Sequence, residues 1–324
     1  MASSSAALVV TETAAGALVP VALVDHARAF AAEAKAPATR RAYAGAWRAF
    51  VAWAEAHQVA AMPAAPEAVA CYLTALAEAG RRVPSLELAL AALAAAHQAA
   101  GYESPRTAPV VREVMKGIRR ALGVAPHPKA PVRVSELRAM LAAAPAGRLG
   151  LRDRALLLVG FASALRRAEL VALNVEDVAT GEDGLTITLR RSKTDQEGAG
   201  RTIGVPLSAA PETCPVRALR AWLTEAAITE GPIFRGVSRH GALGPRLSGR
   251  GVARVVQRAA AAVGLEASTF GGHSLRAGLA TAAAKAGKSE RAIMAQTGHR
   301  SVTMVRRYIR EASVFTDNAA AGLL

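Results

Sequence analysis

A short segment with three prolines most constrains the fold of this chain, because it separates two long stretches that are compatible with helix. Residues 123–131 read Gly-Val-Ala-Pro-His-Pro-Lys-Ala-Pro. Proline lacks the N–H that a helix interior needs, and several prolines close together stiffen an extended chain. We therefore expect residues 123–131 to link two domains, residues 23–122 and 132–324, behind a disordered tail at residues 1–22. With 324 residues, each domain can bury a core of its own.

The first half of the chain has the periodicity of amphipathic helices. Apolar side chains recur along one helix face at Tyr43, Trp47, Phe50, Val51 and Ala54. Thr39 precedes most of this stripe and is expected to cap the helix. Further helices are predicted at about residues 66–80, 85–100 and 109–122, with proline or glycine between them. These patterns predict a compact helical bundle.

The second half combines helices with a small predicted sheet. Leu185-Thr-Ile-Thr-Leu189 alternates as a strand does, and Arg201 to Val205 is its expected partner. The polar residues 190–200 between them are expected to form a long hairpin tip. Ser135 is the expected cap of the first helix in this half. Helices are predicted at about residues 135–144, 151–163, 167–173, 215–227, 248–263, 274–286, 289–296 and 302–310.

The charge of the chain points to a polyanionic partner. Lys and Arg number 40 against 25 Asp and Glu, a net charge of +15. The balance is +4 in residues 1–130 and +11 in residues 131–324, so tight phosphate contact is expected in the second half. Such a balance favours nucleic acid or an anionic membrane surface. A GC-rich genome would explain why Arg outnumbers Lys, but it would not explain the net charge.

Several other function classes lose their usual sequence support. No apolar run reaches the roughly 18 residues of a membrane span, and no early basic residues indicate a secretory signal. Cys71 and Cys214 cannot by themselves form a disulfide framework or a zinc cluster, which favours a reduced cytoplasmic compartment. The sequence contains no P-loop, HExxH or GxGxxG motif, so ATP, zinc-protease and dinucleotide chemistry are disfavoured.

A histidine and an arginine lie together at one predicted helix start. His273 and Arg276 are three residues apart and directly follow Gly271-Gly272. Backbone N–H groups at a helix start also face anions, so this position suits phosphate. Taken alone, the pair also fits an ordinary helix N-terminus with an incidental arginine.

A tyrosine surrounded by cations follows near the end of the chain. Tyr308 stands among Arg306, Arg307 and Arg310, nine residues after His299. Cations lower the pKa of a phenol and neutralise a phosphodiester, which suits a tyrosine that attacks phosphate. An ordinary half-buried tyrosine is the alternative interpretation.

Two further basic positions stand at the ends of predicted elements. Arg166 and Arg167 close an apolar helix, where they can bind phosphate or simply complement the helix dipole. Lys193 lies in the predicted hairpin tip, where a basic residue can serve chemistry or only solubility.

These basic, histidine and tyrosine residues, taken in order, resemble one known family. Arg166, Lys193, His273-x-x-Arg276, Gly298-His299 and Tyr308 follow one another, each at a helix end or on the hairpin. The sequence resembles the tyrosine recombinases of the phage integrase family over about residues 35–324. The segments that carry the resemblance besides the motifs are Thr39-Arg-Arg-Ala-Tyr through Trp53-Ala, Gly272-His-Ser-Leu-Arg-Ala-Gly and Met304-Val-Arg-Arg-Tyr-Ile-Arg310. The last two are similar to the Cre/Xer-like branch, for which no arm-binding domain is expected.

The resemblance implies a mainly α, two-domain DNA clamp. Residues 23–122 would be a helical, SAM-like core-binding domain that contacts DNA. Residues 132–324 would be an α+β catalytic domain with a small antiparallel sheet. Arg41 and Arg48, which lie off the apolar stripe of their helix, are the nominated DNA-reading side chains.

The resemblance also assigns roles to individual residues. Arg166 and Arg276 would grip the non-bridging phosphate oxygens, and Tyr308 would be the nucleophile that forms a 3′-phosphotyrosyl ester. His273 would act as the base, His299 as a donor to phosphate and Lys193 as the acid for the 5′ oxygen. Glu169 would support the site from behind, and no metal, ATP or other cofactor is expected.

Some positions depart from the family pattern without removing a chemical group. Ala164 stands where many members have Gly, Arg167 where many have an apolar residue, and Ala277 where His is frequent. The expected partner is double-stranded DNA with a specific inverted-repeat site, bound by a homotetramer in the synaptic complex and not at a membrane. The expected location is cytoplasmic and nucleoid-associated. A type IB-like topoisomerase and a catalytically silent DNA-binding protein are the alternative functions.

Overall fold

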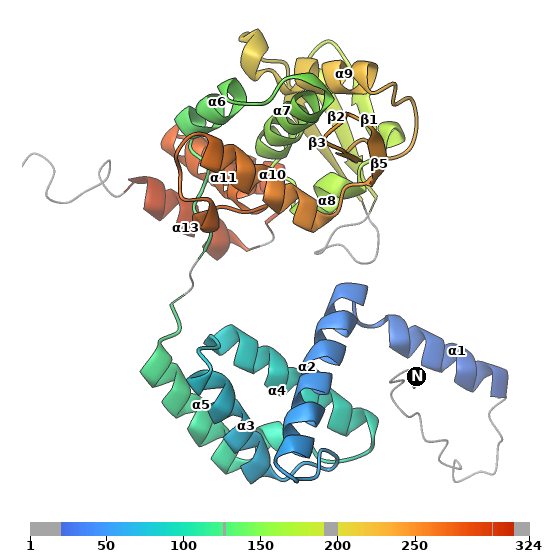
Figure 1. The fold of residues 1–324 in the computed structure, drawn as a ribbon, viewed down its shortest axis with the longest axis vertical. Helices are drawn as coiled ribbons and strands as arrows, with labels where there is room; N and C mark the ends of the chain where they lie inside the picture. The colour runs from blue at the N-terminus through green and yellow to red at the C-terminus, as the bar shows by residue number, and fades with distance from the viewer. Residues whose placement is uncertain (1–20, 126–127, 191–199, 300, 314–324) are drawn as a thin grey trace, which may run out of the picture. The chain divides into compact units, whose positions relative to one another are not determined.

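The computed structural model describes residues 21–125, 128–190, 200–299 and 301–313 (Figure 1). The chain divides into two compact units, with the boundary between Pro126 and His127. That boundary falls inside the segment predicted as a linker. Each unit has its own apolar core, centred on residues such as Phe50 and Leu73 in the first and Leu156 and Trp222 in the second.

The first unit is helical throughout its described part. Its helices are α1 (Val21–Glu33), α2 (Pro37–Ala56), α3 (Pro66–Glu78), α4 (Val83–Ala99) and α5 (Pro109–Leu122). The three ranges predicted in this unit agree with α3, α4 and α5 to within two residues. Residues 1–20 of the predicted tail lie outside the described residues, and its last two residues begin α1. Arg41 and Arg48 of α2 are exposed. The expectation that Thr39 caps α2 is wrong, because the helix begins two residues earlier at Pro37. Proline suits the first helical position, since its φ is preset and its missing N–H would have no partner there.

The core of the first unit holds one buried histidine. His97 is fully buried, with Nε2 accepting a hydrogen bond from the Ala64 N–H at 2.9 Å. Its Nδ1 therefore carries the ring proton and donates to the Leu93 carbonyl at 2.8 Å. Both ring nitrogens are satisfied, so His97 holds the loop at Ala64 against α4.

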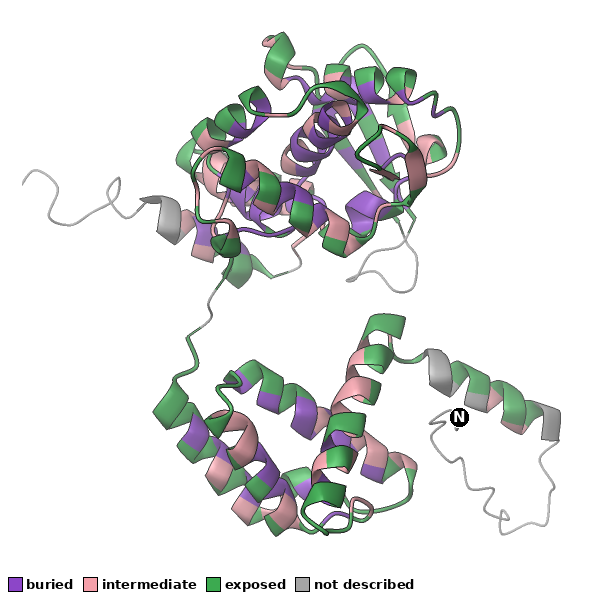
Figure 2. Ribbon diagram, viewed as in Figure 1, coloured by how far each residue is buried: buried purple, intermediate pink, exposed green. Residues whose placement is uncertain are grey.

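The second unit places helices around small antiparallel sheets. Its helices are α6 (Val134–Ala142), α7 (Gly147–Ala162), α8 (Arg167–Ala172), α9 (Pro215–Glu225), α10 (Gly249–Ala262), α11 (Ser274–Lys285), α12 (Glu290–Thr297) and α13 (Val302–Ser313). Most of α7 between Arg152 and Gly160 is buried, as Figure 2 shows in purple. An apolar helix enclosed in this way fixes the position of its end, where the Arg166 segment follows.

The start of α6 corrects a second predicted cap. The helix begins at Val134, so Ser135 lies inside its first turn rather than before it. The Arg133 N–H donates instead to Glu136 Oε2 at 2.8 Å. A carboxylate at the third helical position can accept a hydrogen bond from the N–H of the cap residue, and Glu136 caps the start of α6 in this way instead of Ser135.

The sheet registers locate the hairpin that was predicted from sequence. Strands β1 (Val178–Thr180), β2 (Gly184–Leu189) and β3 (Arg201–Pro206) pair antiparallel in that order. The β2–β3 pairing runs from Gly184↔Pro206 to Leu189↔Arg201, and residues 191–199 of the predicted hairpin tip lie outside the described residues. Strands β4 (Arg235–Val237) and β5 (Leu243–Arg246) form a separate ribbon. Strands β1, β4 and β5 were not predicted, because strands of three or four residues are too short to show alternation in the sequence.

The chain that enters the second unit lies directly on α11. The Ala130 N–H donates to the Thr269 carbonyl at 2.9 Å, and the Val132 N–H donates to the Ser274 carbonyl at 3.0 Å. Gly278 makes this close approach possible, because a Cβ there would lie 2.3 Å from the Val132 carbonyl oxygen. In the part of the chain that the structure describes, no helix has the length and apolar character needed to span a bilayer.

This contact predicts that Gly278→Ala destabilises the second unit. The added methyl would meet both the Val132 oxygen and Phe161 Cε2, the latter at 2.9 Å. Overpacking of this kind costs about 1–3 kcal/mol. Urea unfolding of the full chain, followed by circular dichroism, measures the change. Gly204→Ala is the matched control, because nothing lies within 4 Å of a Cβ at that position. Equal midpoints for the two variants would contradict the close approach.

Candidate active site

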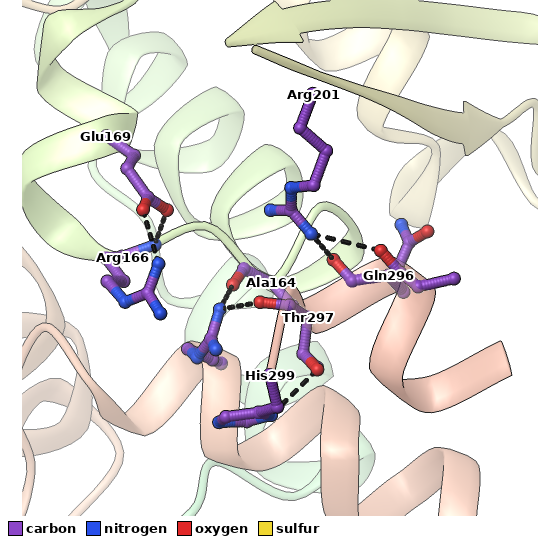
Figure 3. Close-up of polar contacts among 9 residues, drawn as sticks. Ala164, Arg166, Glu169, Arg201, Gln296, Thr297 and His299 are labelled. Carbon is purple, nitrogen blue, oxygen red and sulfur yellow. Dashed lines mark hydrogen bonds and ion pairs between the residues drawn. The ribbon is translucent and has the colours of Figure 1, made fainter. Parts of the chain in front are cut away.

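Arg166 is placed by a sharp turn between α7 and α8. Ala164 has a φ of 50°, a left-handed conformation that is uncommon for a residue with a Cβ. Arg166 then stands at the N-cap of α8 and donates from Nη1 to Glu169 Oε1 at 2.6 Å. The Arg166 N–H donates to the other oxygen, Glu169 Oε2, at 2.9 Å. The buried Glu169 therefore orients both the backbone and the guanidinium of Arg166 (Figure 3).

Arg276 is a buried guanidinium that joins two helix ends. Its side chain comes from α11 and is only 1% exposed. Nη1 donates to the Ala164 carbonyl at 2.8 Å and to the Thr297 carbonyl. Nε and Nη2 are buried and have no hydrogen-bond partner among the described residues. Buried donors without a partner are costly, so these nitrogens are suited to binding an anion.

Burial and neighbouring charge act on Arg276 without neutralising it. Burial, and then the nearby Arg166, lower the pKa of Arg276 from 12.5 to about 10. The group therefore stays protonated at pH 7. A cation that is kept charged inside the protein provides a strong local positive potential.

Tyr308 lies in a small apolar cluster and points its hydroxyl at His273. The tyrosine belongs to α13, is 9% exposed and packs against Ala277, Ile293 and Val305. Its hydroxyl lies 3.4 Å from His273 Nε2. That separation is long for an O–H···N bond, as catalytic contacts often are before substrate binds. The packed ring fixes the direction of the hydroxyl, while the histidine is exposed at the N-cap of α11.

A hydrogen bond to Thr297 orients the ring of His299. The Thr297 hydroxyl donates to the Ile293 carbonyl at 2.6 Å, so its oxygen is left to accept from His299 Nδ1 at 2.8 Å. The ring of His299 also lies beside that of Tyr308, with centroids 5.9 Å apart. In the neutral ring Nδ1 carries the proton, and Nε2 is an unprotonated base.

Both histidines are disfavoured as cations in the free protein. Desolvation, and then Arg276 and Arg166, lower the pKa of His273. The same causes in the same order lower the pKa of His299 from 6.5 to about 4. Each imidazole is therefore neutral at pH 7, so His273 can accept a proton from the tyrosine hydroxyl that faces it.

The structure brings most of the sequence-nominated residues together. Contacts through Thr297 and between the rings link Arg276, His299, Tyr308 and His273. The Arg166–Glu169 pair lies close enough to Arg276 to act on its pKa. Lys193 lies outside the described residues. Arg41 and Arg48 belong to the first unit. Among the described residues, no group of three or more His, Cys, Asp or Glu side chains is arranged to hold a metal ion.

Sequence reasoning missed Arg201, the first residue of β3. Its Nη1 donates to the Ala295 carbonyl at 3.0 Å and to the Gln296 carbonyl at 3.3 Å (Figure 3). Desolvation, which is partly offset by Glu169, lowers the pKa of Arg201. The only available signal was a basic residue at the end of the hairpin, and nothing in the spacing linked it to residues almost a hundred positions away.

A family model and curated relatives match this chain. The model described as the Phage integrase family matches residues 132–313. An integrase/recombinase xerD homolog of Selenomonas ruminantium is 38% identical over 292 residues, which cover 89% of this chain and 85% of that protein. The recombinase cre of Escherichia phage P1 is 25% identical over 284 residues, which cover 81% of each chain.

Solved structures share the fold at low sequence identity. A lambda integrase dimer bound to a COC′ core site has a TM-score of 0.60 at 20% identity, covering 89% of this chain and 75% of that one. The XerH site-specific recombinase bound to palindromic difH substrate has a TM-score of 0.54 at 18% identity, covering 78% and 71%. These similarities show a common fold.

The positive potential of the site predicts that Arg166→Met raises the pKa of His299. The guanidinium repels an imidazolium, so its removal favours the protonated ring. An NMR pH titration of the ring signals in the full chain should give a midpoint of about 4 for the wild-type protein and a higher one for the variant. Arg220→Met, which removes an exposed arginine of α9, should leave the midpoint unchanged. A wild-type midpoint near 6.5 would show that His299 is not desolvated.

Proposed function

Since this chain belongs to the phage integrase family and is a tyrosine-type site-specific recombinase, we propose that it cleaves and rejoins DNA through a 3′-phosphotyrosyl ester on Tyr308. The observation that carries the proposal is the 3.4 Å approach of the Tyr308 hydroxyl to His273, beside a buried Arg276 with two donors that have no partner among the described residues. A nucleophile, a base and a charge clamp are the groups that phosphoryl transfer to a tyrosine requires.

The nucleophilic step begins with proton transfer from Tyr308. The neutral His273 accepts the hydroxyl proton at Nε2 as the phenol oxygen attacks phosphorus. The Tyr308 O–P bond forms, and the bond from phosphorus to the 5′ oxygen breaks. The 3′ side of the strand stays on the protein as an ester, and the 5′ side leaves as an alcohol.

The two arginines stabilise the charge that develops on the phosphoryl oxygens. Arg276 offers Nε and Nη2, and Arg166 is oriented by Glu169 at the N-cap of α8. Guanidinium forks match the geometry of two phosphate oxygens. Fixed cations in a partly desolvated site supply the charge stabilisation without a metal ion.

His299 and Lys193 complete the proposed machinery. His299 donates to a phosphate oxygen only when Nε2 is protonated, because Thr297 occupies Nδ1. The negative phosphate offsets the arginine charges and favours that protonation. Lys193 provides the proton for the departing 5′ oxygen. The ester conserves the energy of the broken bond, so a 5′ hydroxyl from another strand can reseal it without ATP.

The first unit is proposed to hold the DNA around the cleavage site. Its exposed Arg41 and Arg48 lie on α2, away from the buried Phe50 and Ala54 of the same helix. Residues 23–122 would therefore act as the core-binding domain and residues 132–324 as the catalytic domain. A related XerH is described on a palindromic substrate, which supports an inverted-repeat target here. Recombination between two such duplexes would use a homotetramer.

Covalent trapping in cells tests the proposal, with Tyr308→Phe as the matched variant. Wild-type protein should retain DNA after lysis in strong denaturant, and the recovered fragments should centre on one inverted-repeat site. Tyr308→Phe should retain none, because it lacks the attacking oxygen, while a gel shift on the recovered site shows unchanged binding. Scattered adducts would favour a type IB-like topoisomerase, and binding without any adduct would favour a silent DNA-binding protein.

Loss of the buried clamp should slow cleavage strongly. Arg276→Ala is expected to reduce the single-turnover cleavage rate by roughly 10²-fold or more, as loss of a preorganised charge does. Arg276→Lys should be intermediate, because an ammonium retains the charge and lacks the fork. Circular dichroism should confirm that both variants are folded. A near-normal rate for Arg276→Ala would reject its role in the transition state.

A further inference from the structure

The C-terminal end of α12 is capped almost entirely by two arginines from other elements. The Gly298 N–H closes the helix by donating to the Met294 carbonyl at 2.7 Å. Arg201 Nη1 donates hydrogen bonds to the next two carbonyls, those of Ala295 and Gln296, and Arg276 donates to the carbonyl of Thr297. The last carbonyls of a helix have no partner within the helix and carry its negative dipole end, so cations suit them.

The turn after α12 has the shape that Arg201 requires. Gly298 has φ 65° and ψ 38°, a left-handed conformation that glycine adopts without strain. A Cβ on Gly298 would lie 2.5 Å from Arg201 Nη1 and 2.7 Å from its Cζ. The guanidinium therefore lies against the turn itself, at the residue from which the chain continues to His299.

A second contact ties the same helix end to the same strand. The Gln296 side-chain amide donates to the Gly204 carbonyl at 3.0 Å and to the Ala162 carbonyl at 2.7 Å. These bonds join α12 to β3 and to the end of α7 (Figure 3 labels Arg201, Gln296, Thr297 and His299). The turn that leads to His299 is therefore held against β3.

We propose that Arg201 is a positioning residue that acts through His299, by holding the Gly298 turn in the geometry that brings the imidazole to the scissile phosphate. The inference rests on the proposed cleavage chemistry for its functional consequence. Nη1 of Arg201 is engaged with the helix carbonyls, and its buried Nη2 has no hydrogen-bond partner among the described residues.

Hydrogen exchange of the Gly298 amide tests the structural part without DNA. Arg201→Met keeps the aliphatic stem and removes the donors, so the turn loses its cap. The Gly298 N–H, measured by NMR on the full chain, should exchange roughly 10-fold faster or more in this variant. Unchanged exchange would overturn the proposal.

Arg246→Met is the matched control for that measurement. Arg246 of β5 also caps a helix end, with Nη1 donating to the Val171 carbonyl at 2.7 Å and to the Leu173 carbonyl at 3.3 Å. Its removal takes away the same kind of bond at α8 and leaves the Gly298 turn intact. Faster Gly298 exchange in Arg246→Met would mean general loosening, which contradicts a specific role for Arg201.

A double-mutant cycle tests whether Arg201 acts through His299. With the duplex recovered on the wild-type protein as the probe, Arg201→Met should slow single-turnover cleavage by roughly 10-fold to 10²-fold, as loss of positioning does. In a His299→Ala background it should cost little more, because the group that it positions is gone. Arg201→Lys, which retains charge and donors, should restore part of the rate.

The outcomes separate failure of the inference from failure of the proposed function. Suppose that the wild-type protein cleaves, and that Arg201→Met slows cleavage by the same factor in the wild-type and His299→Ala backgrounds. Arg201 then does not act through the histidine, and the proposal is overturned. If the wild-type protein forms no adduct, the proposed cleavage chemistry fails. In that case the exchange measurement still decides whether Arg201 holds the turn.

Discussion

The buried guanidinium of Arg276 is the interaction on which the geometry of the site depends. It is 1% exposed. It donates hydrogen bonds to the carbonyl of Ala164, in the turn after α7, and to the carbonyl of Thr297, the last residue of α12. A buried charge is costly unless several hydrogen bonds compensate it, and here Nη1 alone is paired within the described chain. The protein therefore fixes the position of the cation and leaves Nε and Nη2 for the phosphate of the proposed reaction.

Helix ends provide the other chemical groups of the site. Arg166 stands at the N-cap position of α8, His273 stands at that of α11, and His299 follows the left-handed turn that ends α12. Backbone groups at helix ends lack partners within the helix, so charged side chains collect there and hold one another in place. The apolar α7 and the small cluster around Tyr308 give these ends a rigid support. The residues that pack the helices and the residues of the candidate site therefore lie next to one another on the same helices.

Most helices could be predicted from the sequence, but some of their starts could not. Apolar periodicity located the helical segments, because it reflects burial of one face. The caps at Thr39 and Ser135 were wrong, since Pro37 begins one helix earlier and Glu136 caps the other through its side chain. The short strands β1, β4 and β5 depend on pairing with distant segments, and their own residues carry no recognisable alternation.

The residues of the candidate site could be nominated from the sequence, because their order and spacing are local chemical patterns. Arg166, His273, Arg276, His299 and Tyr308 could be nominated with no knowledge of their distances. The tertiary structure decided which groups touch. It placed the Tyr308 hydroxyl 3.4 Å from His273, lowered the pKa of His299 by burial and arginine charge, and brought Arg201 to the end of α12. These outcomes arise from packing between residues far apart in the chain, where desolvation and carbonyl geometry act together and sequence spacing carries no information.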